Sequence, residues 1–196
     1  MNVLCFSPFP ERIGDCFLAT EDLVEFLCQP PTLEAVSVRG PAIIVNYGCP
    51  YIYHSDVLQR YSVINLHISL LPWNRGPHPN LWSWIDGTPK GVTIHYIDDG
   101  IDSGDIIAQR EVVLDETETL RTCQDRLLCA ADRLFAEQWK LIREGRATRR
   151  EQPLGGSSHC VEDTRLFKAR LPPDISLDEL AVGRLKLFRS NGKKFG

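Results

Sequence analysis

An amide, an imidazole and a carboxylate lie in two short segments of this sequence. Asn65 and His67 stand two positions apart at the end of an apolar run, and Asp102 follows in a segment rich in aspartate and glycine. Side chains two positions apart in an extended segment share a face, so Asn65 and His67 can aim at one small target. An amide and a protonated imidazole can stabilise an oxyanion, and a carboxylate can help to move a proton. This combination predicts the transfer of an acyl group without a metal or a covalent intermediate.

Each of these residues also has an ordinary structural explanation. A histidine beside apolar residues is more often structural than catalytic. Asp98, Asp99, Asp102 and Asp105 could be solvated carboxylates of a hairpin loop, and their spacing lacks the pattern and terminal glutamate of a calcium loop. The alternative is that Asp102, carried on a flexible glycine-containing backbone, pairs with His67 and favours its charged form.

The composition is that of a globular protein. The chain has 196 residues, of which 43% are hydrophobic and 24% charged, so we expect one domain spanning residues 1–196. A net charge of −4 argues against general nucleic-acid binding, and no apolar run is long enough to cross a bilayer. The first residues do not resemble a signal peptide, which favours a cytoplasmic location. Seven cysteines without a CxxC pair do not favour a zinc site, so no metal is expected.

Hydrophobic patterning predicts strands that alternate with helices. Strands are expected at residues 3–7, 42–46, 62–67, 91–97 and 105–113, and helices at 20–28, 82–85, 115–145 and 177–187. This order indicates an α/β sheet that is parallel in its first half. Functional sites of such sheets lie at the carboxyl ends of strands. Asn65, His67 and Asp102 all follow predicted strands, so they could converge there.

Three ordered motifs resemble the folate-dependent formyltransferase family. They are Asn65-x-His67-x-Ser-Leu-Leu-Pro-x-x-x-Gly76, Gly91-Val-Thr-Ile-His95 and Ile101-Asp-Ser-Gly-Asp-Ile-Ile107. The family includes glycinamide ribonucleotide, methionyl-tRNA and amino-sugar formyltransferases. The resemblance implies a Rossmann-like formyltransferase fold and a single catalytic domain. It also implies that 10-formyltetrahydrofolate, acting as co-substrate, donates a formyl group to a primary amine.

The resemblance further implies roles for individual residues. Asn65, His67 and Asp102 match the catalytic triad of the family: the first two would hold the oxyanion, and Asp102 would assist proton transfer. Tyr51 and Tyr53 match a loop that lines the pterin pocket in relatives, although packing at the sheet edge explains them equally well. Backbone hydrogen bonds to the pterin are expected from a second loop, formed by Ile97, Asp98, Asp99 and Gly100.

The sequence also departs from parts of the family. Residues 7–14, after the first strand, lack the glycine spacing of the phosphate loop expected of a glycinamide ribonucleotide enzyme. The length leaves no room for the extra C-terminal domain of methionyl-tRNA enzymes, and the acidic balance agrees with that exclusion. Only about 35 residues separate the strands at Val3 and Ile43, whereas one βαβ crossover takes about 30. This spacing predicts a shortened N-terminal half, whose open sheet edge a second copy of the chain could cover in a homodimer.

These departures leave the amino-sugar enzymes as the nearest functional match. The predicted acceptor is therefore a small molecule, the amine of a nucleotide-linked amino sugar. Arg75 could meet a phosphate, Asn80 belongs to the same loop beyond the motif, and Trp82 could stack on a base or a sugar. Packing of a short helix onto the sheet is the alternative for the tryptophans, more so for Trp84 than for Trp82. Basic residues near the C-terminus, from Arg184 to Lys194, are expected to be solvated.

Three other functions stay open at this point. The first is formylation of another small amine, such as a hydroxyornithine. The second is hydrolysis of the formylated folate, with water as the nucleophile. The third is a pseudoenzyme that binds folate without turnover, which a shortened N-terminal half would favour and the intact Asn65, His67 and Asp102 oppose.

Overall fold

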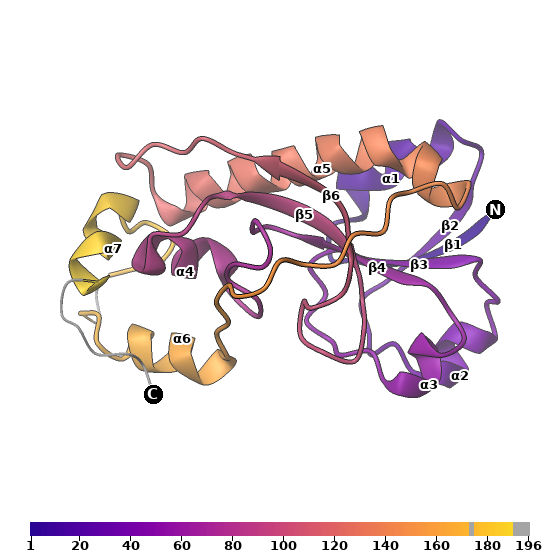
Figure 1. Cartoon of the computed structure of the whole chain (residues 1–196), viewed down its shortest axis with the longest axis horizontal. Coiled ribbons are helices and arrows are strands. Elements are labelled where there is room, and N and C mark those ends of the chain that lie inside the picture. Colours follow the sequence, from indigo (N-terminus) through magenta and orange to yellow (C-terminus); the bar gives the residue numbers. More distant parts are fainter. Residues whose placement is uncertain (173–174, 190–196) are drawn as a thin grey trace. The chain divides into compact units, whose positions relative to one another are not determined.

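The computed structural model describes residues 1–172 and 175–189. Six strands in the described part of the chain form one sheet in the order β2-β1-β3-β4-β5-β6 (Figure 1). The strands are β1 (Asn2–Phe6), β2 (Leu23–Leu27), β3 (Ile43–Asn46), β4 (Val63–His67), β5 (Gly91–Tyr96) and β6 (Ile106–Glu111). The helices in the same residues are α1 (Pro10–Leu18), α2 (Leu33–Ser37), α3 (Ser55–Leu58), α4 (Pro79–Asp86), α5 (Leu120–Arg143), α6 (Val161–Lys168) and α7 (Val182–Arg189). The predicted α/β class is confirmed.

The chain divides into two compact units. The first comprises Met1–His67, Thr93–Gln109 and Ala131–Gln152. The second comprises Ile68–Val92, Arg110–Ala130 and Pro153–Gly196. Each unit has its own hydrophobic core, and the expectation of a single catalytic domain stays a prediction.

The first unit contains a mostly parallel sheet with helices on both faces. Strand β1 pairs in parallel with β2 and β3, β3 pairs in parallel with β4, and β4 pairs antiparallel with β5. Helices α2 and α3 lie on one face and α1 on the other, beside the second half of α5 (Figure 1). The predicted parallel arrangement of the first half is therefore confirmed, and the carboxyl ends of β1, β3 and β4 meet at one edge.

Alternating side chains of the strands explain this layering. Leu4 and Phe6 of β1 pack in one cluster with Val36 of α2 and Val57 of α3. On the helix α1, the ring of Phe17 meets aromatic rings of α5 edge-on, at centroid distances of 5.7 and 4.9 Å; these belong to Phe135 and Trp139. Strands β3 and β4 are buried on both faces, which requires the continuous apolar runs seen in the sequence.

The helix predicted at residues 20–28 is wrong, because this segment contains strand β2. Its apolar residues have helical spacing, but Leu23–Leu27 pairs residue for residue with Asn2–Phe6. The helix lies earlier, in α1, where Pro10 occupies the first turn. Proline suits that position because its fixed φ matches the helix and its missing N–H has no partner there. Between β1 and β3 the chain therefore carries two β–α units, rather than the one crossover that its length suggested.

The remaining strands follow the predictions, whereas several helices differ in position or were not predicted. The predicted strands 3–7, 42–46, 62–67, 91–97 and 105–113 correspond to β1, β3, β4, β5 and β6. Helix α5 begins at Leu120 rather than at Asp115, since Glu118 Oε1 accepts a hydrogen bond from the Asp115 backbone, at 2.8 Å, in the turn before the helix. Helices α2, α3 and α6 were not expected. Helix α4 begins at Pro79 rather than at Trp82, and the terminal helix begins at Val182 rather than at Leu177. The basic residues Lys193 and Lys194 lie outside the described residues.

The second unit has a core built around helix α4. Trp82 and Trp84 of α4 lie in a buried cluster with Cys123 of α5, Phe167 of α6 and Leu185 of α7. Within the described ranges, no helix combines the length and the apolarity that a membrane crossing requires.

Candidate active site

A row of three buried polar side chains crosses neighbouring strands of the first unit. Asn46 of β3 is the register partner of Asn65 of β4, and Asn65 is the register partner of His95 of β5. Their exposed fractions are 7%, 8% and 1%. Because buried polar groups need partners, this row must satisfy its own hydrogen bonds.

Backbone carbonyls set the direction of these hydrogen bonds. His95 Nδ1 lies 2.7 Å from the carbonyl oxygen of Tyr96. A carbonyl only accepts, so Nδ1 carries the hydrogen and Nε2 of the neutral ring is an acceptor. Asn65 Nδ2 lies 3.1 Å from His95 Nε2 and can donate to it when that ring is neutral, while Asn65 Oδ1 accepts from Asn46 Nδ2 at 2.9 Å.

The carboxylate of Asp102 faces the donor end of the Asn65 amide. Asp102 Oδ1 accepts from Asn65 Nδ2 at 3.2 Å and lies 3.4 Å from His95 Nε2. Asp102 Oδ2 lies 3.6 Å from Nδ1 of His67, which is 7% exposed. The structure thus brings the three predicted catalytic residues together, from the end of β4 and from the loop after β5.

The loop that carries Asp102 is held by specific contacts. Asp98 Oδ1 accepts hydrogen bonds from the Gly100 backbone at 3.0 Å and from Ser103 Oγ at 2.7 Å. Gln152 Nε2 donates to the carbonyl oxygens of Asp102 and Gly104, each at 2.8 Å. Asp102 itself has a φ of +48°, in the left-handed region, which aspartate tolerates better than most residues.

The glycines of this loop serve close packing rather than flexibility, contrary to the expectation. A Cβ on Gly104 would lie 2.0 Å from the carbonyl oxygen of Tyr96, and one on Gly100 would lie 2.1 Å from Ser103 Oγ. Such distances are far below van der Waals contact. The loop therefore approaches β5 closely, and this approach places Asp102 beside Asn65.

This arrangement can stabilise negative charge and move a proton. The Asn65 N–H that faces Asp102 could donate instead to an oxygen at the strand ends, and His67 in its charged form can add a second donor. The Asp102 carboxylate, 3.6 Å from His67 Nδ1, could interact electrostatically with that charged form. Among residues 1–172 and 175–189, no group of three or more histidine, cysteine, aspartate or glutamate side chains is arranged to hold a metal ion.

The residues expected to bind folate differ in exposure. Tyr51 is 37% exposed, whereas Tyr53 is 5% exposed and its hydroxyl donates to Asn46 Oδ1 at 3.3 Å. In the second loop Ile97 is half-buried, and the exposed residues are Asp98, Asp99 and Gly100. Tyr53 thus extends the polar row, while Tyr51 and the second loop are open to solvent.

The residues expected to bind the acceptor all lie in the second unit. The Arg75 backbone pairs with residues 157 and 159. Trp82 has no exposed surface, and its ring stacks on His159 with centroids 3.9 Å apart and an interplanar angle of 5°. His159 Nε2 is in turn 2.8 Å from Asp86 Oδ2. Trp82 is therefore packed within the unit in this structure, and a role in binding stays a prediction for it.

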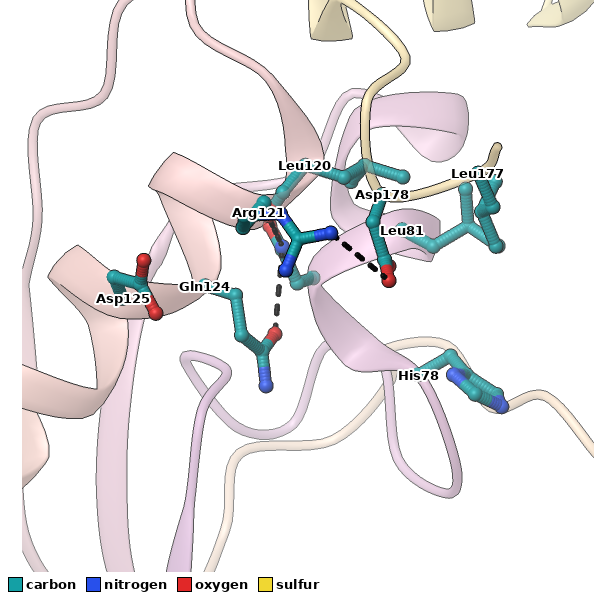
Figure 2. A pocket seen from close by; sticks show the side chains of 9 residues that line it. His78, Leu81, Leu120, Arg121, Gln124, Asp125, Leu177 and Asp178 are labelled. Carbon is teal, nitrogen blue, oxygen red and sulfur yellow. Dashed lines mark hydrogen bonds and ion pairs between the residues drawn. The ribbon is translucent and has the colours of Figure 1, made fainter. Parts of the chain in front are cut away.

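Asn80 lines a cavity of about 280 Å³ within the second unit. Figure 2 shows other side chains that line it, among them Arg121, Gln124 and Asp178. Asn80 Nδ2 donates to the Leu120 carbonyl oxygen at 2.9 Å and to Gln124 Oε1 at 3.4 Å. Arg121 also lines the cavity and lies 4.0 Å from Asp178. The other lining residues are His78, Leu81, Asp125 and Leu177.

Sequence reasoning missed two contributors to the site in the first unit. Asn46 is the last residue of the otherwise apolar strand β3, and it is buried beside Asn65. A polar residue at the end of such a run was the available signal. Gln152 lies in a segment expected to be a plain loop, and no pattern distinguished it from its neighbours.

The open α/β sheet carries at its strand ends a polar site whose residue types would suit acyl transfer. The sequence model described as "Formyl transferase" matches residues 28–138, more than half of the chain. This chain belongs to the formyl transferase family.

Relatives of known kind fall into two groups. Methionyl-tRNA formyltransferase of Clostridioides difficile (strain 630) is 36% identical over 123 residues, 61% of this chain and 40% of that protein. The dTDP-4-amino-4,6-dideoxyglucose formyltransferase of Mycobacterium bovis (strain ATCC BAA-935 / AF2122/97) is 31% identical over 121 residues, 62% of this chain and 52% of that protein. The matched part is thus about half or less of these curated relatives.

A solved structure matches nearly the whole chain. The formyltransferase PseJ from Anoxybacillus kamchatkensis, in complex with UDP-4,6-dideoxy-4-formamido-L-AltNAc and tetrahydrofolate, superimposes with a TM-score of 0.87 at 38% identity. The match covers 96% of this chain and 99% of PseJ. A sugar N-formyltransferase from Shewanella sp FDAARGOS_354 shares the fold, with a TM-score of 0.77 at 20% identity, over 96% of this chain and 87% of that one.

Proposed function

We propose that this protein transfers a formyl group from 10-formyltetrahydrofolate to the primary amine of a nucleotide-linked amino sugar. The observation that carries the proposal is the position of Asp102, in the loop after β5, 3.2 Å from Asn65 and 3.6 Å from His67 at the end of β4. Family membership supplies the formyl chemistry, and this site offers the donors and the carboxylate that the chemistry requires.

The chain's own residues can serve each part of the reaction. The amine nitrogen bonds to the formyl carbon, and the bond from that carbon to the folate nitrogen breaks. Asn65 and charged His67 stabilise the oxyanion that forms in between. Asp102 holds His67 in its charged form and assists the proton that leaves the amine and reaches the folate nitrogen. Binding both reactants in one site contributes through proximity.

Two loops of the first unit are proposed to bind the folate. Tyr51 is exposed and can cover the pterin ring, while Tyr53 supports it from the buried side. The backbone groups of the second loop would meet the pterin edge. Asp98 favours that role because its carboxylate already accepts hydrogen bonds within the loop and so holds the backbone in place.

The acceptor class is supported by the likeness to PseJ. The formylated sugar in its crystal structure is linked to UDP, and the match covers 96% of the present chain. The mycobacterial relative is named for a dTDP-linked amino sugar. In the second unit, Arg75 and the cavity at Asn80 would contact such an acceptor, and Trp82 would shape the site through its packing on His159.

The direct test offers several amines to the protein together with 10-formyltetrahydrofolate. Mass spectrometry would detect the gain of one formyl group on UDP-linked or dTDP-linked 4-amino-4,6-dideoxy sugars. If the protein formylated methionyl-tRNA and none of the amino sugars, the proposed acceptor would be wrong. This substrate is included because one relative, 36% identical, is a methionyl-tRNA formyltransferase. Folate binding without formylation of any amine would overturn the proposed function.

His67 provides the matched variant for this test. We expect His67→Ala to lower kcat about 1,000-fold, because it removes both an oxyanion donor and a proton carrier. His54→Ala changes an exposed histidine that holds no assigned role, so its kcat should equal that of the parent protein. Near-normal turnover by His67→Ala would remove this residue from the mechanism.

A further inference from the structure

We propose that Asn46 is a positioning residue for this reaction, which holds the Asn65 amide with its N–H groups turned towards Asp102. The proposal rests on the proposed function and adds a residue to its machinery. Asn46 acts through Asn65, to whose Oδ1 it donates a hydrogen bond of 2.9 Å. Register pairing of β3 with β4 places the two side chains at the same level of the sheet.

The orientation of the Asn46 amide is determined independently of Asn65. Asn46 Nδ2 also lies 3.3 Å from the carbonyl oxygen of Cys49, which can only accept. At the other end, Asn46 Oδ1 accepts from the hydroxyl of Tyr53 at 3.3 Å. The N–H end of Asn46 therefore faces Cys49 and Asn65. Asn65 must then accept the hydrogen bond through its Oδ1.

This orientation matters because the two ends of an amide have opposite chemistry. An oxyanion needs the N–H end of Asn65, which lies 3.2 Å from Asp102 Oδ1. If the Asn65 amide turned over, its oxygen would face the Asp102 carboxylate, and its N–H groups would face those of Asn46. The donor supplied by Asn46 therefore selects the orientation in which Asn65 can bind negative charge.

Burial makes the selection strong. Asn46 and Asn65 are 7% and 8% exposed, so a polar atom that loses its partner gains little from water. Without the Asn46 donor, Asn65 Oδ1 would be left unsatisfied, and the amide would lose the contact that fixes its angle. Misplacement of a catalytic group by about 1 Å can cost about 100-fold in rate.

Substitution of Asn46 by aspartate replaces the donating amide nitrogen with an accepting carboxylate oxygen. The size and shape of the side chain stay nearly the same. In Asn46→Asp a carboxylate oxygen faces Asn65 Oδ1, which favours the turned-over Asn65 amide. We expect kcat to fall about 100-fold, with the KM for 10-formyltetrahydrofolate changed less than about threefold. Asn46→Ala removes the donor without putting an acceptor in its place. We expect it to lower kcat about tenfold.

A double-mutant cycle separates positioning from a general structural effect. In an Asn65→Ala background, Asn46→Asp should change kcat less than about twofold, because the residue it acts through is gone. Thr20→Val is the control, because it removes partly buried hydrogen bonds just before the start of β2, away from the carboxyl ends of β3 and β4 that carry the site. It should lower Tm and leave kcat unchanged. If Asn46→Asp does not fold, Asn46→Ala carries the same cycle.

The outcomes distinguish the two proposals. Formylation by the parent protein, with additive effects of the Asn46 and Asn65 substitutions, would overturn the positioning role and leave the proposed function standing. A raised KM for folate with unchanged kcat would also overturn it, since that pattern indicates lost binding. A parent protein that formylates no amine would overturn the proposed function, and the role of Asn46 in it would fall as well.

Discussion

Hydrogen-bonding direction is the property that matters most at the level of single residues. The carbonyl of Tyr96 fixes the His95 ring, and the carbonyl of Cys49 fixes the Asn46 amide, so Asn65 is oriented from both sides. Asp102 then meets the N–H end of Asn65. The chemistry of the site therefore depends on two backbone carbonyls that carry no sequence signal.

Asp22, in the first unit, shows how a buried carboxylate is stabilised in this protein. Its side chain has no exposed surface, and Arg143 Nη2 lies 2.9 Å from Oδ1. Trp139 Nε1 donates to Oδ2 at 3.0 Å. Burial alone would raise the pKa of Asp22, but Arg143 and the other donors outweigh it and hold this pKa well below its ordinary value.

We expect Asp22→Asn to lower the free energy of unfolding by about 3 kcal/mol at pH 7, because it leaves Arg143 without its carboxylate. A lowered folded-state pKa gives stability that is fully present above the unfolded value near 4 and is lost as the pH falls below it. The difference between parent and variant should therefore shrink from pH 5 to pH 3. Urea unfolding at both pH values measures it, and a constant difference would contradict the assignment.

At the level of elements, the loop between β5 and β6 is the part that decides the geometry of the site. Gly104 lets the loop approach β5, and Gln152 ties it to the segment after α5 through two hydrogen bonds. Asp102 is thus placed by close packing and by a residue 50 positions away in sequence.

We expect Gly104→Ala to displace this loop, because the new Cβ would lie 2.0 Å from the Tyr96 carbonyl oxygen. Overpacking of this kind costs about 1–3 kcal/mol of stability, and displacement of Asp102 should lower kcat at least about tenfold. Gly14→Ala is the matched control, since no atom lies within 4 Å of its Cβ in α1. That change should raise stability by about 0.5–1 kcal/mol without altering kcat, and equal effects of the two substitutions would refute the packing argument.

At the level of the whole molecule, the chain has two compact units with separate cores. Phe17 is fully buried in the first unit, beside Trp139. Phe167 is fully buried in the second, where its ring lies 5.1 Å from that of Phe188. Strand β2 forms an edge of the sheet, and its coverage by a second copy of the chain stays a prediction.

We expect Phe167→Ala to cost about 3–5 kcal/mol by leaving a cavity, and to open the second unit first. Hydrogen exchange should then rise in residues 161–168 and 182–189, while strands β1, β3 and β4 keep their protection. Phe17→Ala is the matched variant in the other unit and should produce the reverse pattern. Equal loss of protection in both units, from either variant, would show that they unfold as one.

Much of the fold could be predicted because buried strands leave a strong apolar pattern. The strands β1, β3, β4 and β5 were found in this way. Strand β2 was not, because Leu23, Val24 and Leu27 fit a helical face as well as a strand, and only pairing with β1 decides between them. Helix α1 was hidden by prolines, which break most helices but suit the first turn.

The sequence by itself determined which groups are available for the chemistry: Asn65 and His67 share a face because of their spacing, and Asp102 follows the next strand. Only the tertiary structure decided how they are oriented. Asn46, His95 and Gln152 reach the site through strand register and loop packing, which join residues distant in sequence. Local pattern carries no information on such pairings, because they depend on the free energy of the whole folded sheet rather than on neighbouring residues.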